Sequence, residues 1–315
     1  MKKFLKSLLI GGLILSSITI TLFNPQFSNE FYNNLKDDQF NLHTSQNKTF
    51  IVGTLDGPTD LDPVHALDSA STGVIYQVAE GLFMHDLSDP ELKIVPILAA
   101  NYGVWDITRM HYTIPLRQGV TFHDGTNFNA SSVKWNFERI NWFLNATGDI
   151  NTTRTKCQFL WKLPNGSLIL DQMNPVTINN EYSITINLAG SYTILESLLC
   201  YVNAYILSPA STPKNTVINT TSGDLVGTGP FVYDYYIADN EVRFHRWDSY
   251  WRETAFLDEM IFVIIDDSYT RSNALLNGSI HYLIGYYSGL LPTFRDDPEI
   301  IVEENKVSSL GYYYI

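Results

Sequence analysis

Residues Arg117–Ile140 carry the pattern that most constrains the fold of this chain: a strand end, a tight turn and a capped helix in direct succession. Before the turn, apolar and polar residues alternate over His111–Arg117, which is typical of a half-buried strand. Residues 123–126 (His-Asp-Gly-Thr) predict a turn, because Asp hydrogen-bonds its own backbone and Gly adopts the positive φ of a tight reversal. Asn129 or Ser131 is expected to cap the helix that follows. The stretch therefore predicts a rigid corner.

His123 and Asp124 in that turn have two interpretations. Imidazole titrates near neutral pH and a carboxylate can orient it, so the pair is a candidate acid/base or metal-binding element. The sequence places no third partner beside them, and an isolated His-Asp pair in a turn is more often structural. Both interpretations stay open at this stage.

Size and charge limit the class of protein. The chain has 315 residues, 45% of them hydrophobic, which is enough for a sizeable core and about two domains. Its net charge of −13 argues against a nucleic-acid partner, because phosphate binding requires an excess of Lys and Arg.

Met1–Phe23 has the pattern of an export signal, since lysines precede an uncharged and mostly apolar run. The run is shorter than the ~20 residues that span a bilayer, and no A-x-A pattern is visible. A cleaved signal peptide and an uncleaved signal anchor, associated with the membrane, therefore both stay open. Residues 24–48 are polar and are expected to form a linker. We expect a protein outside the cell or at its surface.

Sequons and cysteines bear on the same compartment. Some sequons are expected to be used and others not, since short patterns also arise by chance. The seven Asn-x-Ser/Thr sequons begin at Asn47, Asn129, Asn145, Asn151, Asn165, Asn219 and Asn277. Asn129 is a poor candidate, because it sits at a predicted helix cap. Cys157 and Cys200 can pair in an oxidising compartment, but the sequence does not show that they meet.

A second helix is predicted to start near Ser71. The first N–H groups of a helix lack intrahelical partners and attract carboxylates or carbonyl oxygens. Asp68, Ser69, Ala70 and Ser71 are therefore candidate ligand contacts. The alternative is that the Asp68, Ser69 and Ser71 side chains only cap the helix.

Residues 227–231 (Gly-Thr-Gly-Pro-Phe) predict a close backbone approach followed by a strand, because two glycines lack Cβ atoms and Pro230 fixes φ. A phosphate-binding loop is the alternative, but no Gly-Lys-Ser/Thr follows and no helix begins. Thr228 and Gly229 are candidate ligand contacts.

Further elements are predicted from hydrophobic patterning. Val176–Leu188 indicates a hairpin, and a second hairpin is expected across residues 238–240. Met260–Ile265 is apolar enough for a buried strand, and a helix capped by Asp267 or Ser268 leads to another strand at Ile280–Ile284. This order predicts a parallel strand pair.

Together these segments resemble the family 5 extracellular solute-binding proteins, the peptide- and nickel-binding subunits of ABC importers. The resemblance runs from about Phe50 to the last residue. It is carried by LDPVHALDSASTGVIYQVAEGLF, VPILA, GVTFHDGT, VKWNFERI, GTGPF, Tyr250-Trp251 and Leu257-Asp258-Glu259. The chain departs from the family pattern at Ala79, where tyrosine is usual, and at His281, where an acidic residue is usual.

The resemblance implies an α/β lobe of the periplasmic-binding-protein type II class, with a mixed sheet and an inserted α+β subdomain. The expected limits are 49–85 and 213–300 for the two parts of the first lobe, 86–212 for the inserted subdomain, and 301–315 for a crossover strand toward a second lobe. That second lobe is not apparent in the sequence, so we expect a truncated form or a second chain that supplies it.

The resemblance also implies non-covalent capture of a peptide or another small solute for ABC transporter permease subunits, with no enzyme activity and no cofactor. Asp68–Ser71 would line the cleft, with Tyr313 as a wall aromatic and Phe159 or Trp161 as further aromatic candidates. Peptide, sugar and nickel-complex ligands all stay open, because fold does not decide among them and the histidines show no local nickel-binding spacing.

Two other functions are compatible with the sequence. A secreted hydrolase acting on glycan or peptide would use Glu80, Asp124 or His123, but no acid/base pair has a spacing that forces proximity. A glycosylated surface-layer or adhesion protein would use the same sequons and acidity without needing a cleft.

Overall fold

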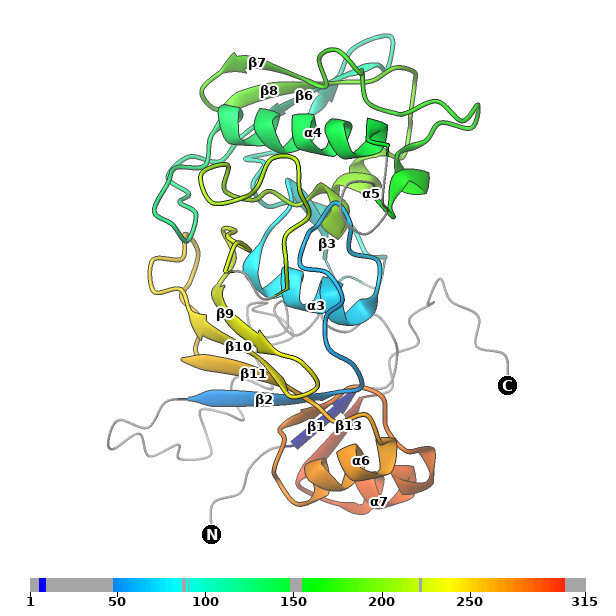
Figure 1. The fold of residues 1–315 in the computed structure, drawn as a ribbon, viewed down its shortest axis with the longest axis vertical. Helices are drawn as coiled ribbons and strands as arrows, with labels where there is room; N and C mark the ends of the chain where they lie inside the picture. Colours follow the sequence, from blue (N-terminus) through cyan, green and yellow to red (C-terminus); the bar gives the residue numbers. More distant parts are fainter. Residues whose placement is uncertain are drawn as a thin grey trace.

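The computed structural model describes residues 6–9, 48–86, 89, 91–147, 155–220 and 223–303. Within these residues the strands form a seven-stranded sheet, a four-stranded sheet and a two-stranded ribbon. Figure 1 shows α3 on one side of the seven-stranded sheet, α6 and α7 on the other, and the four-stranded sheet with α4 at the far end of the molecule. This mixture of helices and strands confirms the predicted α/β class.

The seven-stranded sheet combines a parallel part with an antiparallel edge. Strands β13, β1, β12, β2 and β11 pair in parallel in this order, whereas β10 pairs with β11 and β9 with β10 in antiparallel orientation. In sheet order the strands span Ile300–Glu303, Lys6–Leu9, Tyr282–Leu283, Thr49–Thr54, Glu259–Ile264, Glu241–Arg246 and Phe231–Ile237. The hairpin predicted across residues 238–240 is confirmed, and Asp239 turns it with a φ of 56°.

The predicted strand–helix–strand unit is present as β11, α6 (Ser268–Leu276) and β12. Asp267 caps α6, because its side chain accepts a hydrogen bond from the backbone N–H of Thr270 at 2.7 Å. Both strands are parallel to β2, which lies between them. The two strands are therefore parallel, as predicted, but they are not direct neighbours.

The two faces of this sheet pack against different helices, because side chains of a strand alternate between faces. Val52 of β2 packs in one core cluster with Val74 of α3. The adjacent residue, Ile51, packs against the cluster that contains Leu275 of α6. The bounds are Ser69–Val78 for α3, Ser288–Leu290 for the 3-10 turn η3 and Leu291–Asp296 for α7.

The four-stranded antiparallel sheet contains the predicted corner. Its strands, in sheet order, are β5 (Val104–Trp105), β6 (His111–Pro115), β8 (Ser183–Asn187) and β7 (Val176–Asn180). Helix α4 (Ala130–Asn145) is capped by Asn129, whose side chain accepts hydrogen bonds from the backbone N–H groups of Ser131 and Ser132. Of the two predicted caps, Asn129 is therefore the one used.

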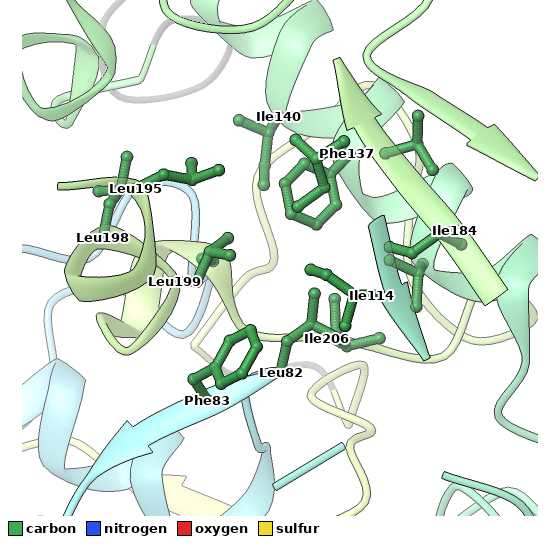
Figure 2. Close-up of a cluster of buried hydrophobic side chains, with 14 of the residues drawn as sticks. Leu82, Phe83, Ile114, Phe137, Ile140, Ile184, Leu195, Leu198, Leu199 and Ile206 are labelled. Carbon is green, nitrogen blue, oxygen red and sulfur yellow. The ribbon is translucent and has the colours of Figure 1, made fainter. Parts of the chain in front are cut away.

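Figure 2 shows how side chains from several elements meet in the core beneath α4. Phe137 and Ile140 of α4 point toward Ile114 of β6 and Ile184 of β8. Leu199 of α5 reaches the same core from a separate segment. The remaining elements are β3 (Phe83–His85), β4 (Ile94–Pro96), η1 (Gln158–Trp161), α5 (Leu195–Leu199) and η2 (Val202–Ala204).

The aromatic candidates in η1 have opposite environments. Trp161 is 1% exposed and meets Phe137 edge to face at 6.3 Å between ring centroids, so its assignment as an aromatic that reaches a ligand is wrong. Its indole ring instead packs in the apolar core under α4. Phe159 is 63% exposed and remains accessible.

Several predictions fall outside the described residues. These are most of the export signal, the linker up to residue 47, Tyr313 with the rest of 304–315, the sequons at Asn47 and Asn151, and the last residue of the sequon at Asn219. Within the predicted signal segment, Lys6–Leu9 form β1, which pairs with β12 and β13 in the seven-stranded sheet. The predicted domain limits stay predictions. In the part of the chain that the structure describes, no helix combines the length and the apolar character needed to cross a bilayer.

Candidate functional site

The carboxyl ends of β2 and β11 form the place where the topology favours ligand binding. These strands are parallel neighbours, but β2 leads toward α3 on one face of the sheet and β11 leads to α6 on the other. In open α/β sheets, ligands bind where the loops after two neighbouring parallel strands leave in opposite directions. The loop 55–60 and the loop 265–267 border this edge.

The predicted residues Asp68–Ser71 lie at this edge, where they join α3 to the loop after β2. Asp68 is the N-cap and accepts a hydrogen bond from the Ser71 backbone N–H at 2.7 Å. The buried Ser71 hydroxyl donates to Asp68 at 2.7 Å and accepts from the backbone N–H groups of Thr59 at 3.0 Å and Asp60 at 2.9 Å. The capping role of Asp68 and Ser71 is thus realised, and the Ser71 hydroxyl is fully engaged.

Two donors of this helix end remain. The backbone N–H groups of Ser69 and Ala70 have no hydrogen-bond partner among the described residues. Ser69 is exposed and Ala70 is half-buried. Because the helix dipole places partial positive charge at its N-terminus, these two groups are suited to a carboxylate or a carbonyl oxygen.

The Asp60 side chain connects the loop after β2 to a distant chain segment. The Asp60 carboxylate lies 2.7 Å from Nδ1 of the buried His65 and 2.8 Å from Nζ of Lys156. Burial alone would raise the pKa of Asp60, but the hydrogen bonds from His65 and Lys156 outweigh it and lower the pKa below its ordinary value. The ionised Asp60 therefore links the loop to the chain segment that precedes η1.

Thr228 and Gly229 lie at the opposite end of α3. The Gly229 backbone N–H donates to the Val78 carbonyl at 2.9 Å. A Cβ added at Gly227 would lie 2.2 Å from the same carbonyl oxygen, which explains the glycine. Since α3 has 10 residues, its two ends are roughly 15 Å apart. The structure therefore does not bring Thr228 and Gly229 together with Asp68–Ser71.

Glu80 holds this second end of α3 in place. Its buried carboxylate accepts hydrogen bonds from Thr228 Oγ1 at 2.8 Å, Tyr250 Oη at 2.8 Å and Trp251 Nε1 at 2.7 Å. Arg252 adds an ion pair at 2.5 Å. Sequence reasoning missed Arg252, although its position directly after the Tyr-Trp motif was a usable signal. Glu80 is thus committed to structure rather than exposed to a substrate.

His123 and Asp124 fasten the predicted corner to the same end. His123 Nε2 donates to the Gly229 carbonyl at 2.8 Å, while Asp124 accepts from the Ser208 hydroxyl at 2.5 Å and the Ser211 hydroxyl at 2.7 Å. Burial lowers the pKa of His123, which favours the neutral ring. The two side chains bind different partners, so the geometry favours the structural interpretation of this pair.

The cysteines are both free and buried. Cys157 Sγ accepts a hydrogen bond from Asn203 Nδ2 at 3.0 Å, whereas Cys200 Sγ lies 3.2 Å from the Glu196 carbonyl. Burial raises the pKa of each thiol to about 12, so neither is a thiolate at neutral pH. Across the described ranges, no cluster of three or more His, Cys, Asp or Glu side chains is placed to hold a metal ion.

A surface hollow of about 590 Å³ lies elsewhere, over the last turns of α4. Its lining includes Glu138, Trp142, Asn145 and Gln172. None of the predicted ligand-contact residues lines it. Sequence patterning carries no signal for this hollow, because its walls come from α4 and an aperiodic loop.

The mixed sheet with helices on both faces, joined to a second α+β unit, defines a lobe of a type II periplasmic binding protein. The chain matches the family described as "Bacterial extracellular solute-binding proteins, family 5 Middle" over residues 93–315, and it belongs to that family. The family and the fold class predicted from the sequence are both confirmed.

Individual relatives place the chain within this family. It is 28% identical over 236 residues to the glutathione-binding protein GsiB of Escherichia coli O1:K1 / APEC, covering 75% of this chain and 42% of GsiB. An ABC transporter substrate-binding protein from Sinorhizobium meliloti has a similar structure, with a TM-score of 0.60, 25% identity, and coverage of 74% of this chain and 42% of that protein. The chain thus spans less than half the length of both relatives.

Another protein of known structure shares the fold. The dipeptide-binding protein of Pseudoalteromonas sp. SM9913, in complex with Met-Leu, superposes with a TM-score of 0.66 and 20% identity. The match covers 79% of this chain and 50% of that protein. The shared part therefore corresponds to half of a longer molecule.

Proposed function

We propose that this chain is the solute-binding component of an ABC transporter outside the cell and that it captures peptides without altering them. Membership of the family supports the solute-binding role. The ligands of two similar proteins, glutathione for GsiB and a dipeptide for the Pseudoalteromonas protein, support a peptide-like ligand. The ligand would bind at the carboxyl edge of β2 and β11.

The observation that carries this proposal is the pair of unpartnered N–H groups at Ser69 and Ala70. They lie at the switch point of the sheet, where a peptide carboxylate or carbonyl would receive two hydrogen bonds and favourable dipole interaction. Asp56 and Asp266 are exposed two residues beyond the ends of β2 and β11, so acidic groups border the same edge. An extended peptide with a positive and a negative terminus complements this arrangement.

The other predicted contacts have different proposed roles. Asp68 and Ser71 would orient the helix end, because their side chains bind the chain itself. Thr228 and Gly229 would fix the far end of α3 and thereby hold the binding edge in position. Tyr313 remains a proposed wall aromatic.

The proposed setting is extracellular. The N-terminal segment would direct export, and it would anchor the chain if it is not cleaved. Partners would be the permease subunits and a second lobe that closes over the peptide. Closure by a second lobe excludes water and strengthens the hydrogen bonds of the cleft. The exported form would carry glycans on part of its sequons.

No catalytic step belongs to this proposal. A hydrolase would need an acid and a base that converge on one substrate bond. Glu80 binds Tyr250, Trp251, Thr228 and Arg252 instead, and the side chains of His123 and Asp124 have separate partners. These contacts favour a binding function over a hydrolytic one.

Saturation-transfer NMR with the full chain and a set of dipeptides, tripeptides and glutathione tests the proposal. We expect saturation to reach at least one peptide, with unchanged peptide after incubation. Ser69→Pro should abolish the transfer, because proline removes the N–H at the first helical position without breaking the helix. Ser69→Ala keeps that N–H and should bind normally. Absence of transfer to every peptide, or appearance of cleavage products, would overturn the proposal.

A further inference from the structure

Two of the Asn-x-Ser sequons adopt the same local conformation. Asn165 Oδ1 accepts hydrogen bonds from the backbone N–H of Ser167 at 3.0 Å and from its hydroxyl at 2.7 Å. Asn277 Oδ1 accepts the equivalent pair from Ser279 at 2.9 Å and 2.6 Å. The two sequons therefore present their asparagine side chains in the same way, although they belong to unrelated segments.

The central glycine of each sequon makes this turn accessible. Gly166 has a φ of 84° and Gly278 a φ of 78°, a region that residues with a Cβ rarely adopt. With this backbone, the third residue of each sequon folds back so that both its N–H and its hydroxyl reach the asparagine carbonyl oxygen. The Asn-Gly-Ser sequence thus determines the shared geometry.

This geometry directs the amide nitrogen outward. Because Oδ1 and Nδ2 leave the same carbon in different directions, anchoring Oδ1 to the turn points Nδ2 away from it. Neither Asn165 Nδ2 nor Asn277 Nδ2 has a partner among the described residues, and both asparagines are exposed. Each is therefore open to a bulky substituent on Nδ2.

Asn145 provides the contrast within the same chain. It is the last residue of α4, and its Nδ2 donates to the Asn141 carbonyl at 2.8 Å and to Gln172 Oε1. A substituent on Nδ2 would remove one N–H and crowd both acceptors, which would disturb the end of the helix. Asn145 thus belongs to a sequon, but its amide nitrogen is not free to accept a substituent.

Asn129 also differs from the two exposed sequons. It is half-buried at the start of α4, and its Oδ1 accepts from the backbone N–H groups of Ser131 and Ser132, whereas Oδ1 of the two exposed sequons also accepts from the serine hydroxyl. The next residue, Ala130, is 1% exposed, so the segment cannot leave the protein surface without opening the core. Among these four sequons, the fold therefore leaves Asn165 and Asn277 exposed with an unpartnered amide nitrogen, engages Asn145 Nδ2 in hydrogen bonds and holds Asn129 half-buried at a helix cap.

We propose that Asn165 and Asn277 are N-glycosylation sites of the folded chain and that Asn129 and Asn145 are not. A lipid-linked oligosaccharide diphosphate would be the donor. The bond between the first sugar carbon and the diphosphate oxygen breaks, a bond from that carbon to Nδ2 forms, Nδ2 loses one proton and the lipid diphosphate leaves. No oxidation or reduction occurs. The proposal rests on the export that the proposed function includes.

The position of Asn277 is compatible with ligand binding. It is the C-cap of α6, and α6 begins at the carboxyl edge of the sheet after β11. A helix of 9 residues carries its C-terminus ~13 Å away from that edge. A glycan on Asn277 would therefore extend from the opposite edge of the sheet and leave the proposed crevice open.

In vitro transfer to the folded, unmodified full chain tests the proposal. The chain is incubated with a purified oligosaccharyltransferase and a lipid-linked oligosaccharide, and occupancy of each sequon is measured by peptide mass spectrometry. Peptides from a proteolytic digest of the same chain serve as the sequence-only comparison, since they keep the sequons without the fold. We expect transfer to all four sequons in the digest but only to Asn165 and Asn277 in the folded chain.

Variants sharpen the result. Ser167→Ala and Ser279→Ala should each abolish transfer at their own site only, whereas Ser167→Thr and Ser279→Thr keep the hydroxyl and should retain it. No transfer at Asn165 and Asn277 in the folded chain, or equal transfer at Asn145, would overturn the proposal. Peptide binding is measured separately, so either proposal can fail without the other.

Discussion

Arg139 of α4 and Asp62 of the segment after β2 form a buried ion pair with two parallel hydrogen bonds. Their side chains are 2% and 0% exposed, and one of the bonds, from Nη1 to Oδ1, measures 2.8 Å. Arg139 also donates to the carbonyls of Pro213 and Thr216, and Asp62 accepts from the Ile218 backbone N–H. The pair therefore joins three chain segments at the junction of the two sheets.

Removing one member of this pair should be costly. Asp62→Asn leaves the Arg139 guanidinium buried without its counter-charge, and such changes typically cost about 3–5 kcal/mol of unfolding free energy. Urea denaturation of the full chain measures this loss. Asp248→Asn is the matched control, because Asp248 pairs with Arg246 while 78% exposed, and exposed pairs contribute about 0–1 kcal/mol. Equal losses in the two variants would contradict the assigned role of Asp62.

Gly227 should not tolerate a side chain. Its added Cβ would lie 2.2 Å from the Val78 carbonyl oxygen, a backbone atom that cannot move without shifting α3. Gly227→Ala is therefore expected to lose at least about 1–3 kcal/mol, the usual range for overpacking. Gly223→Ala is the control, since nothing lies within 4 Å of its Cβ position, and it should be neutral or slightly stabilising. Thermal unfolding of both variants measures these losses. An unchanged stability of Gly227→Ala would contradict the close approach of Gly227 to the Val78 carbonyl.

Local chemistry explains why the corner around residues 123–126 was predictable. Strand β6, the glycine-containing turn and the Asn129 cap each depend on residues within a few positions of one another. The buried face of α4, with Val133, Phe137 and Ile140, follows the helical period. Such features are encoded over short distances, so sequence patterning captures them.

The order of the strands could not be predicted from such local patterns. β2 separates β11 from β12, and its register pairs Thr49 with Glu259, two residues far apart along the chain. The burial of Trp161 was equally invisible, because the surrounding loop has no period from which an inward face could be inferred. Both depend on tertiary packing, which outweighs local propensity.

In the candidate site, too, the local features were predictable from the sequence and their arrangement in space was not. The sequence correctly indicates a capped helix start at Asp68–Ser71 and a close approach at residues 227–229. It does not specify that these segments occupy opposite ends of α3, because the direction of a helix across a sheet is a property of the whole fold. Shared family motifs therefore do not imply a shared ligand pocket in this chain.

Asp124 should make stability depend on pH in acid. Burial tends to raise its pKa, but hydrogen bonds from Ser208, Thr126 and Ser211 outweigh this and lower the pKa to about 2, from an ordinary value of 3.8. Between these values the unfolded chain binds more protons than the folded one, so stability rises with pH and is lost as pH falls from about 4 toward 2. Asp124→Asn should flatten this part of the profile, measured as urea midpoint against pH, relative to the wild type. Asp239→Asn, at an exposed hairpin turn, should leave the slope unchanged. A wild-type slope retained in Asp124→Asn would show that other carboxyl groups dominate acid unfolding.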